Sequence, residues 1–168
     1  VAGAVVSLVL LGNNRVGRIM SWISADCDVA DACYQPLHGM WALGSGGVFG
    51  MGLGASREKW NYLPAAHNDF IFAIIGEELG LVGTMLVLVL FGLLAAAFLR
   101  LVTRHPDPFV KVTTAAIGAW IIGQAFINIA VVIGLAPVVG IPLPLVSAGG
   151  SALIVTMAAM GVVIAFAR

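Results

Sequence analysis

The densest group of side chains able to do acid–base chemistry in this chain leads straight into an apolar run. Its members are Arg57, Lys59, His67, Asp69 and Glu77. A carboxylate beside a histidine can accept a proton from a reacting group, and nearby cations can stabilise an anionic substrate. Charged groups are costly to hold beside lipid unless they are paired or functional, so their position at the mouth of an apolar run favours a site.

Two other interpretations of this cluster stay open. If a helix begins near Asp69, then Asn68 or Asp69 would be its N-cap and accept hydrogen bonds from free backbone N–H groups. With about 100° of rotation per residue, Glu77 would lie about 80° round that helix from Asp69 and could share a cleft with it, whereas Glu78 would face away. The pair Asp69 and Glu77 could also form the proton relay of a transporter.

A second polar segment, residues 140–151, precedes the last apolar run. Its prolines interrupt a helix, and it ends in the small polar turn Ser147-Ala-Gly-Gly-Ser151. Ser147 or Ser151 could cap the final helix, and the free N–H groups at a helix start also suit an anionic ligand. A purely structural re-entrant turn fits these residues equally well.

Two periodic patterns predict close contacts between helices. The third apolar run carries Trp120, Gln124 and Asn128 on one helical face. This face should turn inward, either to form interhelical hydrogen bonds, the commoner outcome, or to line a polar cavity. In the glycine-rich segment 44–54, glycines 46, 50 and 54 would form one smooth stripe on a helix, which favours helix packing over phosphate binding.

Composition defines the solvent of the chain. Hydrophobic residues make up 61% of it, charged residues 10%, and the mean hydropathy is +1.07. A soluble domain carries roughly 25% charged residues, so the expected solvent is a lipid bilayer. A net charge of zero with eight Lys and Arg residues argues against nucleic-acid binding.

The apolar runs predict an all-α, polytopic transmembrane helix bundle. They are Val1–Leu11, Leu79–Leu99, Val112–Gly134 and Ser151–Ala167. The first is much shorter than the roughly 20 residues that a membrane helix needs, so we expect it to be the end of a span that begins outside this chain. A signal peptide is the weaker interpretation, because no basic segment precedes the run.

We therefore expect one transmembrane domain over residues 1–168. Residues 13–78 would form a large loop with re-entrant or short helices, and residues 79–168 the last three spans. Basic residues in short loops stay in the cytoplasm, and residues 100–111 contain Arg100, Arg104 and Lys111. Loop 100–111 is thus predicted to be cytoplasmic, and loops 13–78 and 135–150 to be extracytoplasmic, on one face of the membrane where they could meet.

The two cysteines, Cys27 and Cys33, fall in the long loop. An extracytoplasmic compartment permits a disulfide, which we favour. A metal pair is the weaker alternative, because the nearest other ligands are only Asp26, Asp28 and Asp31.

Two long motifs resemble the SEDS family (shape, elongation, division and sporulation), and its division member more than its elongation member. They are Tyr62-Leu-Pro-Ala-Ala-His-Asn-Asp-Phe-Ile-Phe-Ala-Ile-Ile-Gly-Glu-Glu-Leu-Gly80 and Gly140-Ile-Pro-Leu-Pro-Leu-Val-Ser-Ala-Gly-Gly-Ser151. Tyr34-Gln35, the glycine-rich segment and Lys59 add further matches. The resemblance covers nearly the whole chain and implies the last four of about ten spans in a bacterial plasma-membrane protein.

The resemblance implies a peptidoglycan glycosyltransferase that joins lipid II disaccharides into glycan strands during cell division. Asp69 stands where the family has its essential acid and would be the general base. The substrate-binding set implied here is Gln35, Arg57, Lys59, His67, Glu77, Ser147 and Ser151. The leaving pyrophosphate would be stabilised by Arg15, Arg18, Arg57, Lys59 or a divalent cation such as Mg²⁺ or Mn²⁺, although no metal-ligand pattern singles out a site.

The implied partners are lipid II, a class B penicillin-binding protein transpeptidase and other divisome proteins. A lipid II flippase and a non-catalytic divisome scaffold are the alternative functions. The family usually has Glu, Thr and Tyr where Ala65, Asn68 and Ala148 stand, so no catalytic role is assigned to positions 65 and 148. We expect this chain alone to be inactive, because the earlier spans would complete the cleft.

Overall fold

The computed structural model describes Trp22, residues 33–58 and residues 68–167. These residues form helices α3 (Tyr34–Gly46), α4 (Ile71–Arg104), α5 (Pro108–Val132) and α6 (Gly150–Phe166), and the described part of the chain contains no strand. The all-α prediction is therefore confirmed. Val1–Leu11, predicted to be the end of a span, lies outside the described residues.

Two of the helices are long and apolar enough to cross a membrane. α4 has 34 residues and α5 has 25, against the ranges 79–99 and 112–134 predicted from the apolar runs alone. α4 starts earlier because residues 71–79 continue helically before the span. α6 is equally apolar but has 17 residues, so its role as a full span stays a prediction.

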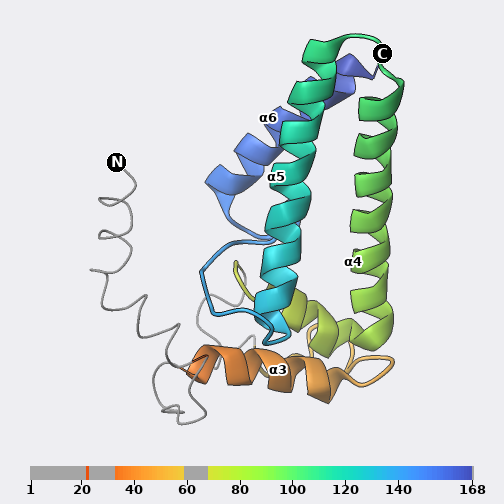
Figure 1. Ribbon diagram of the computed structural model, residues 1–168. Coiled ribbons are helices and arrows are strands. Elements are labelled where there is room, and N and C mark those ends of the chain that lie inside the picture. Colours follow the sequence, from red (N-terminus) through yellow and green to blue (C-terminus); the bar gives the residue numbers. More distant parts are fainter. Residues whose placement is uncertain (1–21, 23–32, 59–67, 168) are drawn as a thin grey trace, which may run out of the picture.

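Figure 1 shows α4 and α5 running side by side, with α6 inclined against α5 and α3 lying across one end of α4 and α5. The turn between α4 and α5 lies at the opposite end, near the C-terminus. The segment after α5 starts at the end of the bundle near α3 and leads to α6, which begins part-way along α5. The described residues of loops 13–78 and 135–150 thus meet at one end, as predicted, while residues 100–111 lie at the other.

α4 is broken at Gly80, whose backbone has φ 65° and ψ −158°. Here residues 47–52 insert between the separated turns of the helix. The backbone N–H groups of Leu81 and Val82 donate to the carbonyls of Gly47 and Val48, and those of Met51 and Gly52 donate to the carbonyls of Glu77 and Glu78. These four backbone groups of α4 thus have partners in the inserted loop, as an apolar environment requires.

This insertion corrects the prediction of a helical glycine stripe. α3 ends at Gly46, and Gly50 and Gly54 lie in the following loop with positive φ. Close backbone approach, the other part of the prediction, is confirmed at Gly46 and Gly50 but not at Gly54, where a Cβ would meet nothing within 4 Å. A Cβ at Gly46 would lie 1.9 Å from the Gly76 carbonyl oxygen, and one at Gly80 would lie 2.4 Å from the Gly50 nitrogen.

The main apolar core lies at the end of the bundle that carries α3. It joins α3, the start of α4, the end of α5 and the segment after it, through Ala42, Phe70, Phe72, Ala73, Ile74, Ala125, Val131, Val132, Val138 and Leu143. A smaller cluster of Phe98, Ile121 and Val163 joins α4, α5 and α6 farther along the bundle. Packing is thus densest beneath the segment that carries Asp69.

Candidate functional site

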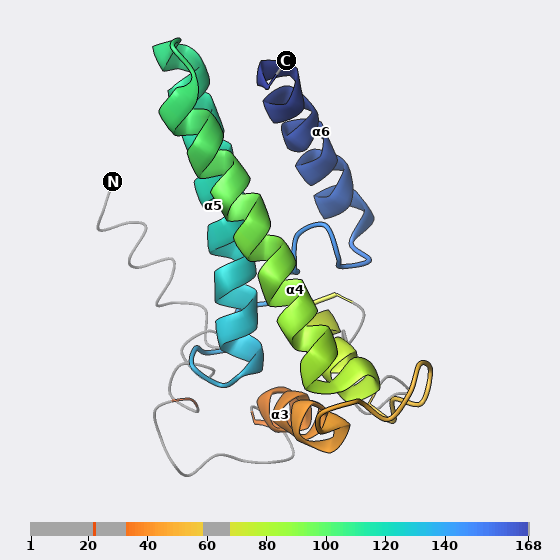
Figure 2. The same cartoon turned by 90° about the vertical axis from the view of Figure 1, so that its right-hand side faces the viewer.

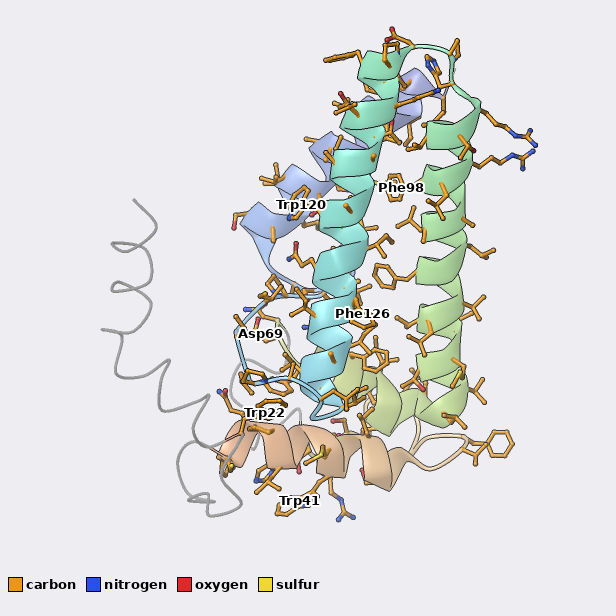
Figure 3. All side chains as sticks on the ribbon, in the orientation of Figure 1. Trp22, Trp41, Asp69, Phe98, Trp120 and Phe126 are labelled. Carbon is orange, nitrogen blue, oxygen red and sulfur yellow. The ribbon has the colours of Figure 1, made fainter. Side chains whose placement is uncertain are left out.

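Asp69 lies two residues before α4, on a short segment held from both sides. The Asn128 amide on α5 donates to the Asp69 main-chain carbonyl at 2.7 Å, and the Ser147 hydroxyl donates to the Asn68 carbonyl at 2.6 Å. The carboxylate faces the segment after α5, since a Cβ built on Gly140 would lie 3.4 Å from Asp69 Oδ2. Figure 3 shows Asp69 beside α5 and the segment that follows α5, both of which are distant from it in sequence.

The polar face of α5 turns inward at two of its three predicted positions. The Asn128 amide also donates to the Ile141 carbonyl at 2.7 Å, and the Gln124 amide donates to the Pro142 carbonyl at 3.1 Å. Trp120 is 44% exposed and helps to line an open groove of about 520 Å³, together with Gln124 and residues 140–142. The inward orientation is thus confirmed at Gln124 and Asn128, but their hydrogen bonds reach non-helical segments rather than another helix. The groove beside Trp120 is lined mainly by apolar residues, so it is not the polar cavity of the alternative prediction.

Two predictions of helix capping are wrong. The N-cap positions of α4 and α6 are occupied by Phe70 and Gly149, which make no side-chain cap hydrogen bond. α4 starts at Ile71, one residue too late for Asp69 to be its N-cap and two residues too late for Asn68. Ser147 is buried and is used instead to hold Asn68, while Ser151 lies exposed inside the first turn of α6.

Glu77 is 2% exposed, and its carboxylate accepts hydrogen bonds from the segment before Asp69. The Ser56 hydroxyl donates to Oε2 at 2.5 Å and the Arg57 backbone N–H donates to Oε1 at 3.0 Å. This carboxylate therefore fastens residues 56–57 to the start of α4. Its predicted role in substrate binding stays a prediction.

A pair that the sequence analysis missed lies on α3. His38 Nδ1 lies 2.6 Å from Glu58 Oε2, with both side chains largely buried. The His38 ring lies between Tyr34 and Trp41, with ring centroids 4.2 Å and 4.9 Å away. Helical spacing brings these three aromatic rings to one face, but nothing local in the sequence indicates Glu58, which is 20 residues away.

The structure describes two of the remaining predicted site residues. Arg57 is exposed and Gln35 is half-buried in the first turn of α3. Lys59, His67, Arg15 and Arg18 lie outside the described residues. Within the described ranges, no group of three or more His, Cys, Asp or Glu side chains could hold a metal ion. Cys33 is disulfide-bonded, as predicted, and Cys27 lies outside the described residues.

These features define a membrane-spanning helix bundle with a polar, hydrogen-bonded site at one end. The sequence profile of the FtsW/RodA/SpoVE group, described as a cell cycle protein, matches residues 1–168. The chain belongs to this family, for which SEDS is the name used above.

Individual relatives agree with this assignment. The chain is 50% identical to the probable peptidoglycan glycosyltransferase FtsW of Mycobacterium tuberculosis over 99% of its own length and 32% of that protein. It is 43% identical to stage V sporulation protein E of Bacillus subtilis over 97% of its own length and 44% of that protein. The chain thus spans about a third to under half of the length of these relatives.

A solved structure shares the fold. It is described as Structural coordination of polymerization and crosslinking by a peptidoglycan synthase complex. One of its chains aligns with a TM-score of 0.69 and 26% identity, over 95% of this chain and 44% of that one. The similar chain belongs to a polytopic family, which agrees with the polytopic arrangement predicted from the apolar runs.

Proposed function

We propose that this chain is the C-terminal part of a longer plasma-membrane protein, a peptidoglycan glycosyltransferase that polymerises lipid II. Support comes from relatives named probable peptidoglycan glycosyltransferases, to which 99% of this chain is 50% identical. The protein that contains this chain together with its earlier spans is called the full-length protein below. A class B penicillin-binding protein transpeptidase is the proposed partner, in keeping with the synthase complex in which a similar chain was solved.

Asp69 is the proposed general base. Its carboxylate removes the proton from the 4-hydroxyl of the acceptor sugar while that oxygen attacks the anomeric carbon of the lipid-linked donor. The bond from the anomeric carbon to the pyrophosphate oxygen breaks, the configuration inverts, and undecaprenyl pyrophosphate leaves with the bonding electrons. The charge on the leaving group requires cations, for which Arg57 and Lys59 are the nearest candidates in sequence.

One observation carries this assignment: residue 69 is positioned through its main chain. Asn128 holds its carbonyl, and Ser147 holds the carbonyl just before it. A base must be placed within hydrogen-bond reach of a hydroxyl, and a rigid main chain provides that placement. Asp69 belongs to loop 13–78, which the basic residues of loop 100–111 predict to be extracytoplasmic. The proposal therefore puts the site on the side of the membrane where the substrate head group must be.

The alternative of a proton-relay transporter has less support. A relay needs both acids to exchange protons along one path, whereas the Glu77 carboxylate is buried and accepts hydrogen bonds from Ser56 and Arg57. Fastening residues 56–57 explains this burial without any transport step. The polymerase therefore remains the proposed function.

The test is lipid II polymerisation by the full-length protein in detergent, where no membrane has to be crossed. Asp69→Asn should lower the rate by about 100-fold or more, the usual contribution of a general base. Asp107→Asn is the matched control, since it makes the same chemical change at the far end of the bundle and Asn still caps α5. Unchanged polymerisation by folded Asp69→Asn would refute the assignment.

A further inference from the structure

The loop that inserts into α4 displays an unusual set of side chains. Residues 47–55 carry no charge, and their apolar side chains point outward: Val48 is 55% exposed, Phe49 85%, Met51 39% and Leu53 81%. Single exposed apolar residues are ordinary, but four within six consecutive positions form a patch that needs a covering surface.

The backbone of this loop is fixed, so the loop cannot turn these side chains inward. Four hydrogen bonds join residues 47, 48, 51 and 52 to the broken part of α4, and Ala55 N–H donates to the Gly52 carbonyl at 3.1 Å. A Cβ built on Gly50 would lie 2.1 Å from the Glu78 carbonyl oxygen, which shows how closely the loop backbone lies against the helix. The outward display of the apolar side chains is thus built into the fold.

The loop lies where the lipid-facing surface of α4 begins. Its hydrogen-bond partners Leu81 and Val82 are 51% and 56% exposed. Only 6% of the residues in the most apolar stretch of α4 are buried. Figure 1 shows the loop extending past the side of α4, and in Figure 2 its tip turns in the direction in which α4, α5 and α6 run. The apolar patch is therefore continuous with the surface that the span presents to acyl chains.

We propose that residues 47–54 are a membrane anchor that inserts Phe49 and Leu53 into the boundary between head groups and acyl chains. Apolar and aromatic side chains are favoured at this depth, where the hydrophobic effect offsets their exposure. The occupant of the patch is the lipid of the bilayer rather than a protein. Since the same loop is bonded to residues 77–82, lipid contact also steadies the helical segment that follows Asp69.

Site-directed spin labelling of the full-length protein in lipid nanodiscs tests this anchor. Cysteines replace Phe49 or Leu53, and their nitroxide labels are exposed to oxygen, which concentrates in lipid, or to a nickel chelate, which stays in water. Gly44→Cys on α3 is the matched control, because its Cβ meets open space three residues after the outward-facing Trp41. We expect labels at 49 and 53 to favour oxygen and the label at 44 to favour nickel.

Two results would overturn the proposal. Nickel access at positions 49 and 53 would place the loop in water, and exclusion of both reagents would show that a protein segment covers it. Phe49→Trp keeps an apolar side chain and gives a second measurement if a cysteine variant does not fold. Lipids brominated near the head group should quench the added tryptophan fluorescence, and an absence of quenching would refute the anchor. Neither readout uses enzymatic activity, so the anchor and the glycosyltransferase proposal can fail separately.

Discussion

The two ends of the bundle differ in how they provide hydrogen-bond partners for free backbone N–H and C=O groups. At the end with the α4–α5 turn, the helices are regular, and Asp107 caps α5 by accepting from Phe109 N–H at 2.8 Å. At the end with Asp69, a helix is broken and an extended segment follows α5. The carbonyls freed at the break in α4 accept from the backbone N–H groups of Met51 and Gly52. The carbonyls of residues 68, 69 and 141 accept from the side chains of Ser147 and Asn128.

At the Asp69 end, polar side chains that hold the main chain can therefore be distinguished from those that could react. Three polar side chains at the Asp69 end bond to the main chain: Ser147 to residue 68, Asn128 to residues 69 and 141, and Gln124 to residue 142. Irregular backbone is tolerated at membrane depth only with such partners. The four predictions below test whether stability indeed depends more on the Asp69 end than on the far end.

The largest stability effect is expected at the helix break. Gly80→Ala places a Cβ 2.4 Å from the Gly50 nitrogen at a φ of +65°, so the inserted loop must move away. Strain and lost hydrogen bonds should together cost more than about 3 kcal/mol. Reversible denaturation of the full-length protein in micelles measures this cost.

Gly92→Ala is its matched control on the same helix, where a Cβ meets nothing within 4 Å. It should be neutral or stabilise by up to about 1 kcal/mol. Equal destabilisation by the two variants would contradict the special role of the break.

Removing the Glu77 carboxylate should have the next largest effect. Glu77→Ala leaves the Ser56 hydroxyl and the Arg57 N–H without their buried acceptor, at a cost of about 3 kcal/mol. Glu77→Gln keeps one acceptor oxygen and should lose less. Hydrogen exchange of the Arg57 amide provides the local measurement, and unchanged protection in Glu77→Ala would disprove the fastening role.

Asn128→Leu should cost about 2 kcal/mol, because the carbonyls of residues 69 and 141 both lose a donor. Gln124→Leu removes only one, partly buried hydrogen bond and should cost about half as much. Denaturation midpoints of the two variants check this order. If Asp69 is the base, Asn128→Leu should also lower polymerisation more than Gln124→Leu does.

The smallest effect is expected at the far end. Asp107→Ala removes the side chain that caps α5 and should cost about 1 kcal/mol. Asp107→Asn should retain most of that stability and leave polymerisation unchanged. If Asp107→Ala lowered the free energy of unfolding as much as Gly80→Ala does, the two ends would not differ in their contribution to stability.

Much of this arrangement was predictable from the sequence, for identifiable reasons. Long apolar runs set α4 and α5. Their alternation with connecting loops predicted one shared face for loops 13–78 and 135–150, and the described residues of these loops do meet at one end. The four-residue spacing of Gln124 and Asn128 indicated an inward face. The capping predictions failed because they assumed that a polar residue before a helix bonds to that helix, whereas Ser147 bonds to a segment 79 residues away.

The sequence by itself determined that the chain is helical and suited to a lipid bilayer, because both follow from composition and from the length of the apolar runs. It also determined the family motif that contains Asp69, because a motif is an order of neighbouring residues. Only the tertiary structure decided that residues 47–52 enter the break at Gly80 and that Glu77 holds residues 56–57. The physical reason is that a backbone group freed in an apolar environment takes whichever donor or acceptor the fold brings near, and that partner is not encoded by spacing.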